Sequence, residues 1–313
     1  MKRSVILVHP PQQGLLEGFS SGLISLANFL SLRAPDVDVR ISDLGLASDV
    51  EVPALVSAAL HESSGDPIVG LTATTATYRS ALKVAWEFKQ AAPECMVVLG
   101  GHHAAPEWRT VLRRQRDIDA IATGEGELTL LDLVQRFPDL SAVRGLAYRD
   151  ASGSIVQTTP PSLLSTADLD QLAVEFQGNG IRSKRGKFGH VTYVSARGCP
   201  LKCHFCSVAN QQIRAKSVPQ VVADLRFLVG ERGYQSVAIE DNFFAHSPKR
   251  TLELCGEIAR LQKELPRSFR WDCQTRVESM RRPELLEALE KAGCESVYLG
   301  VEALDAKSLR YLG

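Results

Sequence analysis

The sequence lacks several features that would assign it to a large class of proteins at once. It has no net charge, because 36 Lys and Arg residues balance 36 Asp and Glu residues over 313 positions. It also has no apolar run long enough for a membrane span, no repeat of solenoid length and no low-complexity tract. The first apolar run, 4–8, is too short for a signal-peptide core. We therefore expect a cytoplasmic protein that binds neither nucleic acid nor a membrane surface.

Cysteine is scarce, and its spacing does not suggest disulfide pairs. Of seven cysteines, three fall within the eight residues 199–206. An odd, clustered set suits metal binding in a reducing compartment better than a disulfide framework. We expect the remaining four to be small buried apolar side chains; they are Cys95, Cys255, Cys273 and Cys294.

The sequence does contain a regular alternation of strand and helix patterns. In the first half, the strand-like runs are 4–8, 37–41, 68–71, 96–99 and 120–122. Between and after them, helical spacing occurs at 22–32, 53–61, 78–91, 107–114 and 127–137. This alternation predicts an α/β domain with a doubly wound parallel sheet, covered by helices on both faces. With 44% hydrophobic residues, the chain is long enough for two domains.

The loops after these strands have an unusual composition. Open parallel sheets bind ligands beyond the carboxyl ends of their strands, so these loops bear on function. They read His9-Pro10-Pro11-Gln12-Gln13-Gly14, Thr72-Ala73-Thr74-Thr75, Gly100-Gly101-His102-His103 and Thr123-Gly124-Glu125-Gly126-Glu127. In any one loop, tight turns explain the glycines. Four such loops favour a ligand-binding rim, because glycine permits close backbone approach and threonine hydroxyls form hydrogen bonds.

The segments 97–104, which reads Val-Val-Leu-Gly-Gly-His-His-Ala, and 121–127 resemble the amino-terminal domain of cobalamin-dependent radical S-adenosylmethionine enzymes. The resemblance implies a flavodoxin-like sheet that binds cobalamin. The implied contacts are His9, Pro10, Gln12, Thr72, Thr74, Thr75, Gly100, Gly101, His102, Gly124, Glu125 and Gly126. No Asp-x-His-x-x-Gly motif is present, so a lower histidine ligand to cobalt from that motif is not expected. His9, His102 and His103 are equally well interpreted as residues that structure their loops.

A hairpin and a linker are expected next. Extended runs at 143–148 and 154–159 flank Asp150-Ala151-Ser152-Gly153, a turn sequence. The stretch 178–187 is glycine-rich and basic and lacks apolar periodicity. We expect a first domain at 1–142, a hairpin and linker at 143–187 that bridges the domains, and a second domain at 188–313.

A compact cysteine motif, Cys199-Pro200-Leu201-Lys202-Cys203-His204-Phe205-Cys206, follows a strand pattern at 190–195. Thiolates ligate iron–sulfur clusters, and three of them leave one iron of a cubane open to another ligand. The alternatives are a zinc site with His204 as a donor, or thiols that are merely buried. Structural zinc sites generally take four ligands in paired spacings, and no second pair is present. The spacing therefore favours a 4Fe-4S cluster on Cys199, Cys203 and Cys206.

Strand and helix patterns continue to the end of the sequence. Helical spacing at 218–231, 248–265 and 283–292 alternates with strands at 236–240, 269–277 and 296–302. This pattern predicts a β/α barrel whose site lies at the carboxyl-terminal rim. Within the strand at 269–277, Asp272, Gln274 and Arg276 share one face, which suits a polar cavity better than a helix layer.

This half resembles the radical S-adenosylmethionine domain, in which an aromatic residue precedes the third cysteine of the triad. The resemblance implies that S-adenosylmethionine binds the open iron, that Glu240-Asp241-Asn242 hydrogen-bonds its ammonium group, and that Arg276 pairs with its carboxylate. The implied contacts are Phe205, Glu240, Asp241, Asn242, Gln274, Arg276 and Glu302. Each one alone is equally well interpreted as an ordinary solvated residue of the rim.

The family barrel usually has six βα units, whereas this sequence supplies four. We therefore expect an incomplete barrel. Either the chain is truncated, or another polypeptide or a second copy closes the open edge.

Together these patterns predict an enzyme whose cofactors, a 4Fe-4S cluster, S-adenosylmethionine and cobalamin, carry the chemistry. No side chain beyond the cluster ligands is assigned a catalytic role. The resemblance implies formation of a 5′-deoxyadenosyl radical and methyl transfer to an unactivated carbon of a small-molecule or natural-product substrate, with flavodoxin or ferredoxin as electron donor. The alternatives are radical cyclisation or rearrangement, radical chemistry without cobalamin, and a metal-binding or redox-sensing module without enzyme activity.

Overall fold

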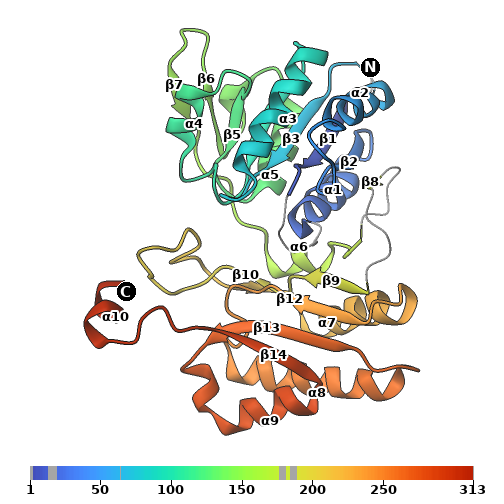
Figure 1. The fold of residues 1–313 in the computed structure, drawn as a ribbon, viewed down its shortest axis with the longest axis vertical. Coiled ribbons are helices and arrows are strands. Elements are labelled where there is room, and N and C mark those ends of the chain that lie inside the picture. The colour runs from blue at the N-terminus through green and yellow to red at the C-terminus, as the bar shows by residue number, and fades with distance from the viewer. Residues whose placement is uncertain (1–2, 13–19, 64, 176–180, 184–188, 313) are drawn as a thin grey trace. The chain divides into compact units, whose positions relative to one another are not determined.

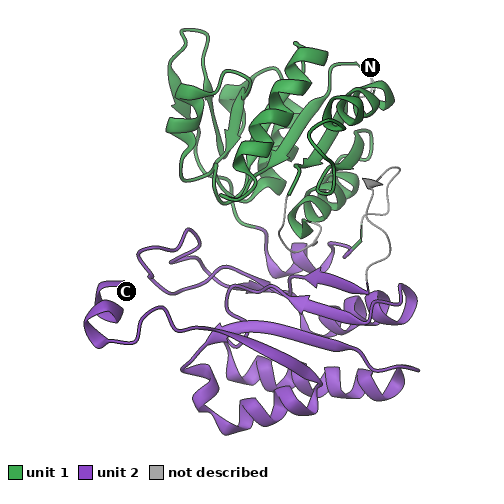
Figure 2. Cartoon of the chain, in the orientation of Figure 1, with its two compact units in different colours: residues 1–163, 175–186 green, residues 164–174, 187–313 purple. Residues whose placement is uncertain are grey.

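The structure is a computed structural model that describes residues 3–12, 20–63, 65–175, 181–183 and 189–312. The chain forms two compact units (Figure 2). The first comprises Met1–Leu163 and Glu175–Gly186, and the second comprises Leu164–Val174 and Lys187–Gly313. Each unit has its own sheet and its own hydrophobic core.

In the described part of the first unit, the sheet has eight strands in the order β7-β6-β5-β4-β3-β1-β2-β8 (Figure 1). The strands are β1 (Ser4–His9), β2 (Asp38–Asp43), β3 (Ile68–Thr72), β4 (Met96–Gly100), β5 (Ala120–Ala122), β6 (Leu146–Arg149), β7 (Ile155–Gln157) and β8 (Ile181–Ser183). All are parallel to their neighbours except β6 and β7. The order β2-β1-β3-β4-β5 is that of flavodoxin-like sheets, which confirms the predicted doubly wound fold.

Helices cover both faces of this sheet. The helices are α1 (Ser21–Arg33), α2 (Val52–Glu62), α3 (Tyr78–Ala91), α4 (Trp108–Arg114) and α5 (Gly126–Arg136). Ile6 and Val8 of β1 join a core with α2, α3 and α4, whereas Val5 and Leu7 join a core with α1 and α5. Because both faces of β1 are buried, its sequence is a continuous apolar run without polar alternation.

Strands β6 and β7 form the hairpin expected at 143–159. The Asp150 carboxylate accepts hydrogen bonds from the backbone N–H groups of Ser152 (2.9 Å) and Ser154 (3.0 Å) and so closes the turn. The hairpin extends the first sheet beside β5, so it belongs to that sheet and does not bridge the units. The changes between units fall later, at 163/164, 174/175 and 186/187. Of the glycine-rich stretch 178–187, only 181–183 lie within the described residues; they form β8, which pairs with β2.

In the described part of the second unit, the main sheet has four parallel strands in the order β14-β13-β12-β9. The strands are β9 (His190–Tyr193), β12 (Ser236–Ile239), β13 (Arg270–Arg276) and β14 (Cys294–Gly300). The helices that follow them are α7 (Val218–Leu225), which continues as the π-helical turn η2 (Arg226–Glu231), α8 (Pro248–Glu264) and α9 (Pro283–Lys291). This alternation is the partial β/α barrel that the sequence predicts.

The helices of the second unit pack on one face of its sheet (Figure 1). Ile239, Trp271 and Cys273 point into the core that α7, α8 and α9 cover. Pro248 and Pro283 begin α8 and α9, at a helix position where no backbone N–H is needed. The unit also contains three short helices, α6 (Thr166–Asp170), η3 (Ser279–Arg281) and α10 (Ala306–Leu312).

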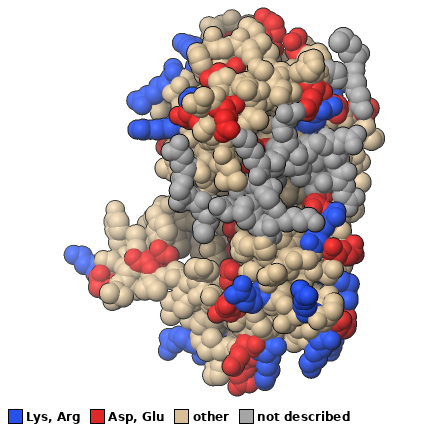
Figure 3. All heavy atoms as spheres, turned by 45° about the vertical axis from the view of Figure 1, so that its right-hand side comes forward, with Lys and Arg blue, Asp and Glu red and all other residues tan. Residues whose placement is uncertain are grey.

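The described residues include no helix long and apolar enough to cross a membrane. Acidic and basic side chains are mixed over the face of the molecule drawn in Figure 3. This mixture agrees with the balance of 36 basic and 36 acidic residues in the sequence.

Candidate functional site

The cysteine motif lies on a loop between two short antiparallel strands, β10 (Ala196–Arg197) and β11 (Arg214–Ala215). We call residues 198–213 the cysteine loop. Its first residue, Gly198, has a φ of +86°, and a Cβ there would lie 2.2 Å from the carbonyl oxygen of Gln212. Only glycine tolerates this backbone conformation together with so close an approach. The local sequence therefore turns sharply just before Cys199.

Hydrogen bonds within the loop organise the three cysteines. The backbone N–H of Cys206 donates to the carbonyl of Cys203 (3.1 Å), and that of Gln211 donates to the carbonyl of Cys199 (2.8 Å). Cys199 is buried, Cys203 and Cys206 are half-buried, and all three thiols are free. Phe205, between the second and third cysteines, is 55% exposed.

This donor set fits an iron–sulfur cluster. Three free thiols on one short loop can each bind a different iron of a cubane. No three His, Cys, Asp or Glu side chains in the described ranges are arranged to hold a single metal ion, and a cubane does not require such an arrangement. His204, the additional donor of the zinc alternative, has its ring Nδ1 2.7 Å from the carbonyl oxygen of Tyr311.

Strand β13 presents two distinct faces. Trp271, Cys273 and Thr275 are buried in or beside the helix-covered core. The opposite face carries Asp272, Gln274 and Arg276, which are half-buried or exposed. The predicted strand alternation is therefore correct, and the polar side chains lie on the face away from the helices.

Two carboxyl groups lie close together on this open face. Burial raises the pKa of Glu240, which directly follows β12, and Asp272 raises it further, whereas His190 lowers it. Burial likewise raises the pKa of Asp272, again against the effect of His190. Asn242 is exposed beside them. A cationic ligand at this rim would favour the ionised form of both carboxyl groups.

The remaining predicted contacts of this rim are also accessible. The Arg276 guanidinium forms an ion pair with Glu278 (Nε–Oε2 3.1 Å), and the two side chains are 42% and 63% exposed. Exposed pairs of this kind contribute little to stability, so Arg276 can exchange partners at low cost. Glu302 follows β14 with a φ of +59° and is exposed.

Asp241 differs from its neighbours. We expected it to contact S-adenosylmethionine, but its side chain is 0% exposed. Its carboxylate accepts hydrogen bonds from the backbone N–H groups of Ser195 (2.6 Å) and Ala196 (2.8 Å) and from the Ser195 hydroxyl (2.5 Å). Asp241 is therefore engaged at the base of the cysteine loop and does not face the open rim.

The four loops of the first unit lie at one edge of its sheet, because β1, β3, β4 and β5 run parallel. Two of the predicted contacts, His9 and Pro10, are buried. The others are exposed or half-buried: Gln12, Thr72, Thr74, Thr75, Gly100, Gly101, His102, Gly124, Glu125 and Gly126. Gln13 and Gly14 of the first loop lie outside the described residues.

The two glycine loops of this rim differ in what they border. Gly101 has a φ of +94°, and a Cβ there would lie 2.6 Å from the carbonyl oxygen of Ala73, so this glycine allows the loops after β3 and β4 to touch. A Cβ at Gly124 would meet no atom of the described residues within 4 Å. Gly124 therefore borders open space.

Two of the three candidate histidines have partners within the rim. The His9 Nε2 lies 3.2 Å from the Gln12 side-chain oxygen. The ring of His103 stacks on Tyr78 with centroids 4.2 Å apart, and its Nδ1 lies 3.2 Å from the Thr75 hydroxyl. Tyr78 was not anticipated from the sequence, because nothing in a helix-forming segment marks its first residue as part of a rim. His102 is exposed.

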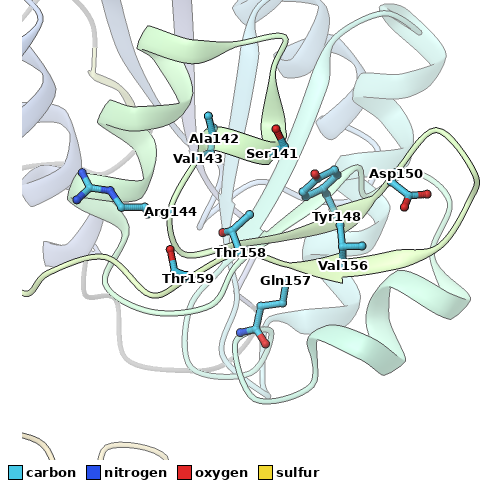
Figure 4. A pocket seen from close by; sticks show the side chains of 10 residues that line it. All are labelled: Ser141, Ala142, Val143, Arg144, Tyr148, Asp150, Val156, Gln157, Thr158 and Thr159. Atoms are coloured by element: carbon cyan, nitrogen blue, oxygen red, sulfur yellow. The ribbon is translucent and has the colours of Figure 1, made fainter.

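A surface pocket lies elsewhere in the first unit (Figure 4). Its walls come from the stretch that leads into and forms the β6–β7 hairpin, and none of the predicted site residues lines it. The lining residues are Ser141, Ala142, Val143, Arg144, Tyr148, Asp150, Val156, Gln157, Thr158 and Thr159.

Comparison with known families assigns a domain type to each half of the chain. The family model of the B12 binding domain matches residues 16–134. The model of the radical SAM superfamily, named after S-adenosylmethionine, matches residues 193–313.

The individual proteins similar to this chain include methyltransferases and a cyclase. An uncharacterized methyltransferase of Pyrococcus horikoshii, PH0819, is 29% identical over 99% of this chain and 67% of its own length. The anaerobic magnesium-protoporphyrin IX monomethyl ester cyclase of Cereibacter sphaeroides is 32% identical over 78% of this chain and 41% of its own length. TsrM of Kitasatospora setae, a radical S-adenosylmethionine methyltransferase solved with cobalamin and a [4Fe-4S] cluster, superposes with a TM-score of 0.81 at 19% identity, over 98% of this chain and 60% of TsrM. The likeness to TsrM shows the fold.

Proposed function

Because the chain belongs to the cobalamin-dependent radical S-adenosylmethionine enzymes, we propose that it transfers a methyl group to an unactivated carbon of a small-molecule or natural-product substrate. The observation that carries this proposal is the succession of a B12 binding domain and a radical SAM domain, with the cysteine triad on the first loop of the second. The chain spans 67% of the methyltransferase PH0819 and 41% of the cyclase, so the activity of the whole protein is part of the proposal.

Cys199, Cys203 and Cys206 are proposed as the cluster ligands. When bound, the cluster supplies the electron that splits S-adenosylmethionine into methionine and a 5′-deoxyadenosyl radical, and cobalamin supplies the methyl group. The outer side of the cysteine loop is accessible to these cofactors, because the thiols of Cys203 and Cys206 are only half-buried and the ring of Phe205 is exposed. Flavodoxin or ferredoxin is proposed as the electron donor.

The open rim of the second unit is proposed to hold S-adenosylmethionine. Glu240 and Asn242 accept hydrogen bonds from its ammonium group, and Arg276 leaves Glu278 to pair with its carboxylate. Gln274 and Glu302 supply further polar contacts from the ends of β13 and β14. Glu240 is exposed to a ligand, and its raised pKa supports this role, because a cationic partner would favour its ionised form.

The loop edge of the first unit is proposed to hold cobalamin. The exposed His102, the exposed Thr74 and Thr75 and the open space at Gly124 support this assignment. His9 and Pro10 are buried, so in this proposal they support the first loop from beneath.

Radical cyclisation is a second candidate function. It is favoured by the 32% identity to the protoporphyrin ester cyclase over 78% of this chain. Methyl transfer is preferred, because the similarity to the methyltransferase PH0819 extends over 99% of the chain.

The first experiment is purification without oxygen and reconstitution with iron, sulfide and hydroxocobalamin, followed by analysis for iron, sulfide and cobalt. We expect about four irons per chain, as a cubane requires, and stoichiometric cobalt. A variant in which Cys199, Cys203 and Cys206 are all replaced by alanine is the control and should bind no cluster. Reduced wild type should then cleave S-adenosylmethionine. Iron without cobalt would leave radical chemistry without cobalamin, and zinc in place of iron would refute the proposal.

A further inference from the structure

The side chains of Asp241, Ser195 and Arg250 meet at the base of the cysteine loop, where Asp241 and Ser195 are buried and Arg250 is half-buried. The loop begins after β10 and ends before β11, and the Lys216 N–H joins the two sides by donating to the carbonyl of Ser195 (2.9 Å). On one side of this junction, the Asp241 carboxylate accepts three hydrogen bonds, two from backbone N–H groups and one from the Ser195 hydroxyl. Asp241 thereby fixes the backbone four residues before the first cysteine.

Arg250 reaches the same junction from helix α8. Its Nη2 donates to the Ser195 hydroxyl oxygen (3.4 Å) and to the carbonyl oxygen of Lys216 (3.2 Å). The Ser195 hydroxyl therefore lies between a carboxylate and a guanidinium. Through these two contacts, one side chain of the helix layer touches the start and the end of the segment that carries the cysteines.

This arrangement is not the one that stability alone would favour. Burial raises the pKa of Asp241, against the hydrogen bonds from Ser195 and Ala196 and the charge of Arg250. Apolar side chains of similar volume are often at least as stabilising as buried ionic groups. In addition, the Nη1 of Arg250 is buried with no partner among the described residues, which costs free energy. Such groups are explained better by the geometry that they impose than by the energy that they add.

We propose that Asp241, Ser195 and Arg250 are positioning residues for the iron–sulfur cluster. They hold β10 and β11 together so that Cys199, Cys203 and Cys206 meet the cluster without rearrangement of the loop. This inference rests on the proposed function, because it assumes that the three thiolates bind a cluster. It gives Asp241 a role that differs from direct contact with S-adenosylmethionine.

The chain offers a matched pair of variants to test this. Ser195→Ala removes a hydroxyl that donates to the buried Asp241 (2.5 Å). Tyr193→Phe, in the strand just before, removes a hydroxyl that donates to the buried Asp224 (2.8 Å). Both variants lose one buried hydrogen bond to an aspartate, but the Ser195 hydroxyl lies at the junction of β10 and β11, whereas the Tyr193 hydroxyl is linked to it only through Asp224 and the Lys216 side chain. Arg250→Met is a third variant that removes the charge and keeps most of the side-chain volume.

Each protein is reconstituted without oxygen, and the rate of iron release to a chelator is measured, together with the electron paramagnetic resonance spectrum of the reduced cluster. Ser195→Ala and Arg250→Met should release iron about tenfold faster than wild type and show a broadened cluster signal, since a charge-assisted hydrogen bond corresponds to roughly one order of magnitude in an equilibrium. The iron-release rate of Tyr193→Phe should stay within about twofold of the wild-type rate. Thermal melts of the apo proteins should be similar for Ser195→Ala and Tyr193→Phe.

Equal iron-release rates and unchanged spectra in Ser195→Ala and Tyr193→Phe would overturn the inference, since the groups would then be purely structural. This result would leave the proposed function intact, because wild type would still hold its cluster. A wild-type protein that takes up no iron would instead refute the proposed function, and the inference with it.

Discussion

At the scale of single residues, the carboxyl groups of Glu240 and Asp272 determine which ligand charge suits the open rim of the second unit. Burial raises the pKa of Glu240, and the charge of Asp272 raises it further, because like charges in a poorly solvated place repel. A ligand that brings a positive charge relieves this repulsion. The rim is therefore suited to a cation, and its affinity should depend on pH.

We predict that binding of S-adenosylmethionine weakens on acidification at a higher pH than an ordinary glutamate would cause. The pKa of Glu240 is raised by burial, so its charged form, which pairs with the ligand ammonium, is present above this raised pKa and is lost as the pH falls through it. Glu240→Gln should raise the Kd about tenfold at neutral pH and flatten the pH dependence. Isothermal titration calorimetry over a pH series measures both effects.

Glu278→Gln is the control for this prediction. It removes the partner of Arg276 and leaves the guanidinium free for the ligand carboxylate, so the affinity should be unchanged or higher. Equal pH profiles for wild type and Glu240→Gln would show that Glu240 does not bind the ammonium group.

A second residue-scale prediction concerns the turn before Cys199. Gly198→Ala places a Cβ 2.2 Å from the carbonyl oxygen of Gln212, so the loop must move and cluster uptake should fall. Gly233→Ala is the matched control, since Gly233 also has a positive φ (+78°) but a Cβ there meets no described atom within 4 Å. It should cost about 1–2 kcal/mol of stability and leave the iron content unchanged. Iron analysis and thermal melts separate the two, and equal iron contents would contradict the prediction.

At the scale of elements, an ion pair ties helix α5 to the segment that leads into β6. The Arg144 guanidinium donates twice to the buried Asp132 carboxylate (Nε–Oδ2 2.7 Å, Nη2–Oδ1 3.1 Å). These hydrogen bonds hold the pKa of Asp132 below its usual range, against the effect of burial. The pair thus fastens the antiparallel hairpin to a helix of the parallel core.

We predict that Asp132→Asn destabilises the first unit by about 1 kcal/mol at neutral pH. This value is low for a charge-assisted ion pair, because the Arg144 side chain is 45% exposed and solvent screens the interaction. A depressed carboxyl pKa contributes stability above the unfolded-state value, about 4, and this contribution is lost as the pH falls through the folded-state value. The urea-unfolding free energies of wild type and variant should therefore converge below about pH 4. A constant difference down to the lowest pH would contradict the prediction.

At the scale of the whole molecule, two units with separate cores are proposed to hold separate cofactors. Gly124 borders open space and its backbone is not in the left-handed region, so Gly124→Trp should fold normally and fill part of the rim. We predict that this variant loses most of its cobalamin and keeps its iron, while the triple cysteine variant loses iron and keeps cobalamin. Cobalt and iron analysis of both proteins tests this, and a joint loss of the two metals in either variant would argue against independent sites.

Local sequence patterns by themselves determined the secondary structure and the fold class of this protein. The strand and helix alternation, the cysteine spacing after β9 and the polar face of β13 all depend on residues close together in the chain, and the structure confirms the fold and the two faces of β13. These features are readable from the sequence because periodicity and spacing are set by the geometry of single elements. The cluster on Cys199, Cys203 and Cys206 remains a prediction that the free thiols support.

Only the tertiary structure decided which groups meet across the fold. The sequence placed Asp241 beside Glu240 and Asn242 as a ligand contact, but pairing of β12 with β9 turns its carboxylate to the Ser195 and Ala196 backbone. Arg250 carries no signal on its helix, and its approach to Ser195 arises from the packing of α8. The hairpin expected between the domains became an edge of the first sheet through pairing with β5. Such outcomes depend on hydrogen bonds between residues far apart in sequence, which no local pattern specifies.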